Sequence, residues 1–205
     1  MDGANPGFCP LDPQIGQGGK IGPNSVIQLG ETVTARLGSD AAWALYCDAG
    51  VPDLLNHPPK AMIDERVPAA LFASLWDMFP QNAALLAEEA GHRTADYIIA
   101  WRIPPVAQIL MRFFPRGLAA RFLLKAIRQH AWTFAGSGKC DIKPGTPHLI
   151  SIRDNPLTMP DCAWHSAVLA RLFDRLVAKG TRVRHVKEFG ASDPVCRFEI
   201  ALPGA

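Results

Sequence analysis

The sequence predicts an α+β fold in which N-terminal helices pack on a small antiparallel sheet. Two observations lead to this class. Up to about residue 130, apolar residues recur at spacings of three and four, which is typical of amphipathic helices. Beyond that point the period changes to two, and the expected order becomes strand, strand, helix, strand, strand. The 205 residues, 48% of them hydrophobic, suffice for one domain with a sizeable core.

The N-terminal part divides into an arm and four helical segments. Residues 1–24 are rich in Gly and Pro, so we expect a flexible arm followed by a single domain over residues 25–205. Helical patterns cover residues 25–49, 64–79, 82–101 and 105–130. The first helix should break near Gly38 and the last at Pro115. Gly91, in the middle of the third, should permit the close approach of another helix or of a ligand.

The C-terminal part alternates in the manner of strands. Residues 130–143 and 146–155 are expected to be two strands joined by a turn. A helix is expected over residues 161–179, with Gly180 as its C-cap. Residues 181–189 and 195–202 then read as a hairpin around the sequence GASDP.

Charge and cysteine usage restrict the class of protein. A net charge of +2 gives no support, as bulk charge, for binding nucleic acid or a membrane surface. The five cysteines are widely spaced and follow a polar N-terminus without a signal peptide, which favours a reduced, cytoplasmic location. No apolar run reaches the roughly 20 residues that span a bilayer, so no transmembrane segment is expected.

The common cofactor and hydrolase motifs are absent. The segment AGSGKC resembles a phosphate-binding loop only faintly, because the full G-x4-G-K-[ST] pattern is missing. There is no G-x-G-x-x-G after a strand, no G-x-S-x-G, no H-E-x-x-H and no C-x-x-C. The sequence therefore shows no nicotinamide or flavin site of a familiar kind.

Four metal-binding side chains gather in the C-terminal part. They are Cys162 at the start of the last helix, His185 and Glu188 on the penultimate strand, and Cys196 on the final strand. Four such ligands can close a tetrahedral zinc site. Residues three apart in a strand point to opposite faces, so His185 and Glu188 meet one metal only if the strand ends or bulges between them. The alternative is that the cysteines are small buried apolar residues and that His185 and Glu188 are solvated.

The same region carries a family resemblance. The tail VRHVKEFGASDPVCRFEI, preceded by CAWHSAVLARLFDRL, resembles the C-terminal half of the 4-vinyl reductase domain. The segment EEAGHRTADYIIAW resembles the glycine-centred helix of that domain, and the match extends over residues 25–202. Within this family the chain is most similar to members that serve bacteriochlorophyll biosynthesis.

The resemblance implies a compact ligand-binding fold, related to nitric-oxide-signalling and Golgi-transport domains. Some sensor members of the family bind zinc through Cys, Glu, Cys and Cys at the positions of residues 162, 185, 188 and 196. This chain has Cys, His, Glu and Cys there, and all four can ligate zinc. The resemblance therefore makes a structural zinc ion a candidate, beside the alternative of buried cysteines and solvated His185 and Glu188.

The first functional hypothesis is a protein of photosynthetic pigment synthesis that binds a magnesium tetrapyrrole, of the Mg-protoporphyrin or divinyl-protochlorophyllide type. A planar apolar ring with carboxylates needs aromatic surfaces, a basic rim and an axial imidazole. Six residues are candidates for these roles: Trp101, Trp132, Phe134, His92, His130 and Arg102. The family name implies vinyl reduction, but hydride transfer needs a donor cofactor, so binding and delivery to another pigment enzyme are favoured.

The second hypothesis is a zinc-stabilised sensor or adaptor module without a pigment role. The family's regulatory members and the C-terminal cluster support it. Related domains form dimers through N-terminal helices, so a homodimer is expected under either hypothesis.

Overall fold

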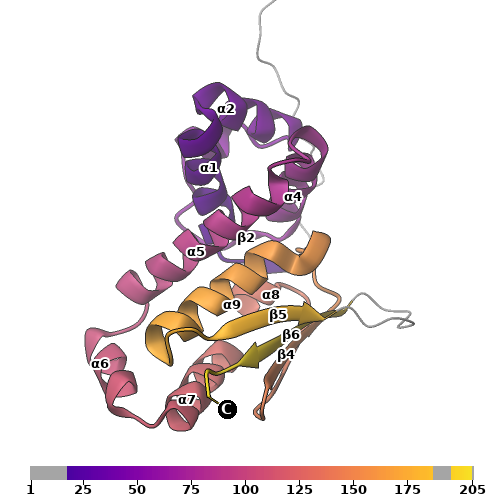
Figure 1. Cartoon of the computed structure of the whole chain (residues 1–205). Coiled ribbons are helices and arrows are strands. Elements are labelled where there is room, and N and C mark those ends of the chain that lie inside the picture. Colours follow the sequence, from indigo (N-terminus) through magenta and orange to yellow (C-terminus); the bar gives the residue numbers. More distant parts are fainter. Residues whose placement is uncertain (1–17, 187–194, 205) are drawn as a thin grey trace, which may run out of the picture.

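The predicted α+β class is confirmed. The structure, a computed structural model, describes residues 18–186 and 195–204 (Figure 1). A series of helices comes first in the chain and a ββαββ unit follows, as the change in apolar period indicates.

Regular secondary structure begins earlier in the chain than expected. Strand β1 (Lys20–Ile21) pairs antiparallel with β2 (Ile63–Asp64), so residues expected to belong to a flexible arm lie in a small two-stranded sheet. Residues 1–17 lie outside the described residues. The helices that follow are α1 (Asn24–Leu37), α2 (Ser39–Asp48), α3 (Asp53–Asn56), α4 (Arg66–Met78), α5 (Ala83–Trp101), α6 (Pro105–Phe113), α7 (Arg116–Gln129) and α8 (Trp132–Ala135).

Two of the helix breaks lie where the sequence places them. Gly38 has φ 94°, a left-handed conformation that glycine adopts without strain, and it separates α1 from α2. Pro115 separates α6 from α7, because proline cannot continue the hydrogen-bond ladder of α6.

One predicted strand is wrong in its first half. Residues 130–138 form a turn after α7, the short helix α8 and a second turn, and the strand begins only at Lys139. A short apolar run such as WTFA fits a buried helical turn as well as a strand, so its period does not distinguish the two.

The main sheet has four antiparallel strands. They are β3 (Lys139–Lys143), β4 (His148–Arg153), β5 (Arg182–Val186) and β6 (Val195–Ala201), in the order β3-β4-β6-β5. Alternate residues are buried along β4 and β6, and the register pairs Ile150 with Phe198 and Ile152 with Cys196. One face of the sheet is therefore apolar and belongs to the core.

Helix α9 (Ala163–Leu176) joins this sheet to the N-terminal helices. It packs against β5 on one side and against α5 on the other. Helix α1 packs on the side of α5 that faces away from α9 (Figure 1). A Cβ atom at Gly91 would lie 2.5 Å from the carbonyl oxygen of Trp164 and 2.7 Å from Cβ of Ala167. The expectation of close approach at Gly91 is therefore confirmed, and the neighbour is the helix α9.

None of the helices that the structure describes is long and apolar enough to cross a membrane.

Candidate metal centre

Cys162 sits at a strained turn immediately before α9. A 3-10 turn (Pro160–Cys162) leads into the helix, and both Asp161 (φ 56°) and Cys162 (φ 42°) have left-handed backbone conformations. Non-glycine residues adopt this region at a cost and concentrate at functional sites. The N–H of Cys162 donates to the carbonyl oxygen of Met159 at 2.9 Å. The turn points the thiol towards the sheet, at a helix N-terminus that favours a thiolate.

The other two ligand candidates come from the hairpin. His185 of β5 pairs in register with Phe198 of β6, whose side chain is fully buried, so His185 lies on the inner face of the sheet. Cys196 lies two residues before Phe198, on the same face, and is 3% exposed. Period-two alternation in β5 and β6 therefore brings His185 and Cys196 to the same side, where α9 begins.

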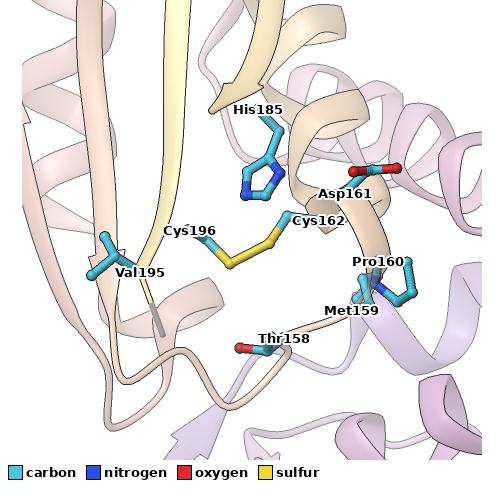
Figure 2. A pocket seen from close by; sticks show the side chains of 8 residues that line it. All are labelled: Thr158, Met159, Pro160, Asp161, Cys162, His185, Val195 and Cys196. Atoms are coloured by element: carbon cyan, nitrogen blue, oxygen red, sulfur yellow. A yellow bond between two sulfur atoms is a disulfide. The ribbon is translucent and has the colours of Figure 1, made fainter. Parts of the chain in front are cut away.

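The three side chains converge on one point. One ligand atom from each of Cys162, His185 and Cys196 lies within 4.8 Å of the other two. The imidazole of His185 points at the two sulfurs, which are joined as a disulfide (Figure 2). Two thiolates and an imidazole are a common part of a four-ligand zinc set. The same two thiols can therefore occur either as a disulfide or as metal-binding thiolates.

Glu188, the fourth expected ligand, lies outside the described residues. The convergence of the other three does not depend on it, because α9, β5 and β6 position them.

A surface pocket of about 350 Å³ opens over this cluster. Residues 158–161 and Val195 form its rim, and Cys162, His185 and Cys196 also line it (Figure 2). A second pocket of about 210 Å³ lies elsewhere, between the start of α7 and residues 145–148, 200 and 202–204.

Asn155 is a contributor that the sequence analysis did not single out. Its side chain is 5% exposed, and its amide nitrogen donates to Sγ of Cys196 at 3.2 Å. The amide oxygen accepts from the N–H of Leu157 at 3.1 Å, which fixes the orientation of the group. A hydrogen bond of this kind stabilises negative charge on the sulfur and orients it. Asparagine in a loop has no motif spacing, so pattern alone could not reveal it.

His165 lies behind the cluster on α9. It is 3% exposed, its Nε2 lies 3.2 Å from the carbonyl oxygen of Phe134, and its ring meets that of Trp164 edge to face. Burial, reinforced by the nearby His185, lowers the pKa of His165 from 6.5 to about 4. His165 is therefore neutral at neutral pH and acts as a packed core residue.

The six residues expected to bind a tetrapyrrole lie on three elements. Trp101 and Arg102 are exposed at the C-terminal end of α5, where the guanidinium of Arg102 lies 5.8 Å from the ring centre of Tyr97. His92 is half-buried in the middle of α5, nine residues before Trp101, about 13 Å along the helix axis.

The remaining three lie close together in sequence. His130 caps the C-terminal end of α7 and is exposed, Trp132 of α8 is 56% exposed, and Phe134 is half-buried near His165. Neither of the two pockets above is lined by any of the six residues.

The segment resembling a phosphate loop has a different role. The carboxylate of Glu65 accepts hydrogen bonds from the backbone N–H of Ser137 at 2.6 Å and from its hydroxyl at 2.7 Å. A Cβ atom at Gly136 would clash with the same carboxylate. A protein anion thus occupies the donors that a phosphate would need, and the loop serves to tie α4 to β3.

Comparison with known proteins gives two close relatives in sequence. A Cereibacter sphaeroides protein named bacteriochlorophyll synthase 23 kDa chain is 42% identical over 191 residues, covering 90% of this chain and 92% of the relative. The protein of the same name from Rhodobacter capsulatus is 35% identical over 209 residues, covering 100% of this chain and 94% of the relative. No family model matches the chain, so the resemblance to the 4-vinyl reductase domain stays a prediction.

Solved structures show the fold. An H-NOX structure from work on heme distortion in that family has a TM-score of 0.60 at 12% identity, covering 90% of this chain and 96% of that one. An oxygen-binding H-NOX domain related to soluble guanylate cyclases has a TM-score of 0.54 at 13% identity, with the same coverage. At such identities the likeness establishes a shared architecture alone.

Proposed function

Because the chain belongs to the family of the bacteriochlorophyll synthase 23 kDa chains, and so to bacteriochlorophyll biosynthesis, we propose that it binds a magnesium tetrapyrrole intermediate of that pathway. The observation that carries this proposal is the 42% identity over 90% of the chain. The fold supports it, because the H-NOX work just mentioned concerns heme, which is also a tetrapyrrole.

The role we propose is binding and delivery rather than vinyl reduction. Reduction of a vinyl group requires a hydride donor held against the substrate. The segment nearest to a nucleotide loop is occupied by the carboxylate of Glu65. A chain that holds the pigment intermediate and passes it to the next enzyme needs an apolar surface and basic side chains and no donor cofactor.

Among the six candidate residues, His130 and Trp132 are the first pair to test. Both are exposed and lie two residues apart at the junction of α7 and α8. An imidazole can take the axial position of a ring-bound magnesium, and an indole can stack on the ring.

The experiment is a titration with Mg-protoporphyrin, followed by its absorption band and by quenching of tryptophan fluorescence. We expect saturable binding at micromolar ligand, weakened about tenfold or more by His130→Ala or Trp132→Ala. Trp43→Ala is the matched control, since Trp43 is a tryptophan of α2 that is 40% exposed. Absence of saturable binding contradicts the proposal. Reduction of a divinyl substrate by the purified chain with a nicotinamide would contradict the delivery role.

We also propose that the C-terminal cluster holds a structural zinc ion through Cys162, His185 and Cys196, with Glu188 as the fourth ligand. The donor set fits zinc in type and convergence. When bound, the ion would supply a cross-link between the start of α9 and the β5–β6 hairpin, and a closed four-ligand site leaves no position for substrate.

Metal analysis of protein purified under reducing conditions tests this site. About one zinc ion per chain is expected in the unmodified protein and in Cys140→Ala, and none in Cys196→Ala. Cys140 is a matched control because it is a half-buried cysteine of the same sheet. Equal zinc contents in the two variants contradict the site.

The alternative of a zinc-stabilised sensor without a pigment role is disfavoured, since both sequence relatives are named for bacteriochlorophyll synthesis.

A further inference from the structure

Helix α6 exposes the apolar face that an amphipathic helix normally buries. Four large apolar residues recur at the spacing i, i+3, i+4 and i+7 and form one stripe, which we call the α6 stripe. They are Val106 (67% exposed), Ile109 (52%), Leu110 (49%) and Phe113 (82%). The opposite face of α6 is turned inwards, where Met111 is 8% exposed. The stripe therefore points away from the core.

Helix α7 extends this apolar surface. Leu118 is 41% exposed and Phe122 is 49% exposed, four residues later on the same helix. The ring of Phe122 stacks on that of Phe114 at 5.4 Å, which joins the two helices across the turn at Pro115. In Figure 1, α6 and α7 form an outer corner of the molecule, at the far end of α5 from α1 and α2. Exposed apolar patches of this kind usually mark an interaction surface.

The chain segment that forms this corner carries charges of one sign. Residues 97–140 contain seven Lys and Arg residues and no Asp or Glu, whereas the rest of the chain has 14 basic and 19 acidic residues. Arg112, Arg121 and Lys125 are exposed on α6 and α7 themselves. The net charge of the chain is therefore only weakly positive, although residues 97–140 are strongly cationic and the remaining residues have an excess of acidic side chains.

We propose that the α6–α7 corner docks the protein onto the surface of a lipid bilayer that contains anionic lipids. A segment with large exposed apolar side chains, basic residues and no acidic residue has the composition of a helix that lies in the membrane interface. Each cation near an anionic surface adds to the attraction. The proposal concerns a helix lying on the membrane and needs no segment that crosses it.

Two other occupants fit the corner less well. A second copy in a symmetric dimer would set the cationic segment against itself, and like charges repel. A small planar ligand is usually held in a concave site, whereas none of the exposed apolar residues of α6 and α7 lines either of the two pockets described above.

Vesicle flotation with the full chain tests the proposal. We expect binding to vesicles of phosphatidylcholine with about 30 mol% phosphatidylglycerol, little binding to phosphatidylcholine alone, and weakening by salt. Phe113→Ser should reduce the partition coefficient about tenfold. Leu85→Ser is the matched control, because Leu85 is 61% exposed at the other end of α5.

Arg112→Gln combined with Lys125→Gln should reduce binding to anionic vesicles several-fold, and Lys179→Gln should not.

Several results would overturn the proposal. It fails if the chain does not float with anionic vesicles, if both vesicle types bind it equally, or if Phe113→Ser and Leu85→Ser behave alike. It also fails if light scattering shows a dimer that Phe113→Ser dissociates while vesicles are not bound. Titration of Phe113→Ser with Mg-protoporphyrin in the absence of lipid should give unchanged affinity, and a lost affinity without vesicle binding would assign the corner to the pigment. The flotation result does not depend on the tetrapyrrole proposal, so either can fail alone.

Discussion

Asn155 illustrates what a single buried amide contributes to a candidate metal centre. Its N–H group donates to the sulfur of Cys196, and removal of such a donor typically lowers metal affinity by about 10- to 100-fold. We expect Asn155→Ala to weaken zinc binding by that factor in a competition assay with a chromophoric chelator. Asn56→Ala, at an exposed asparagine of α3, should bind zinc as the unmodified chain does. Unchanged affinity in Asn155→Ala would show that the amide has no influence on the thiolate.

His165 makes stability depend on pH. Burial lowers its pKa from 6.5 to about 4, so the unfolded chain binds a proton at a pH where the folded chain does not. The free energy of unfolding should therefore fall as pH decreases from about 6.5 to about 4, by about 3 kcal/mol from this residue. Urea denaturation of the metal-free chain across this range measures the slope. His165→Gln should flatten the slope, and a slope that stays the same in this variant would exclude His165 as its source.

At the residue scale, the sequence could identify candidate ligands but not their neighbours. Cys162, His185 and Cys196 are recognisable because cysteine and histidine near a predicted hairpin form a small set of options. The donor Asn155 and the strained turn at Asp161 result from tertiary packing, and nothing in their local sequence distinguishes them from ordinary loop residues.

At the element scale, the contact between α5 and α9 depends on the missing side chain at Gly91. A methyl group there would lie 2.5 Å from the backbone oxygen of Trp164, and backbone moves less readily than the end of a side chain. We expect Gly91→Ala to lower the free energy of unfolding by about 2 kcal/mol or more, measured by urea denaturation. Gly117→Ala in α7 meets nothing within 4 Å and should instead stabilise the chain by up to about 1 kcal/mol. Equal effects of the two substitutions would mean that the helices can separate at little cost.

The elements themselves were predictable where a strong local signal exists. Gly38 and Pro115 end helices for reasons that act within a few residues, and a sustained period of 3.6 identifies α4 and α5. Residues 130–138 were mispredicted because α8 is a single turn. It packs against β1, a tertiary contact that its own sequence pattern does not reveal.

At the scale of the whole molecule, the fold class follows from the switch in apolar period, but the surfaces do not. Trp101 and Trp132 lie on different helices, so whether they share one ligand depends on how α5, α7 and α8 pack. The effect of charge also depends on where the charged residues lie in the molecule. A net value of +2 describes the chain as a whole, whereas the acid-free segment over residues 97–140 determines what the α6–α7 corner attracts.

The link between Cys162 and Cys196 should control the stability of the whole domain. The two residues are 34 positions apart, and closing a loop of that length stabilises the folded state by about 4 kcal/mol when the cross-link restricts the unfolded chain. A disulfide and a zinc ion both provide such a link, so the oxidised and the zinc-loaded chains should melt at higher temperatures than the reduced, chelated chain. Thermal denaturation in the three conditions measures this. Cys196→Ala should melt at one temperature in all three, because it cannot form the link. If the unmodified chain also melted at one temperature, the start of α9 and the β5–β6 hairpin would be held together by packing alone.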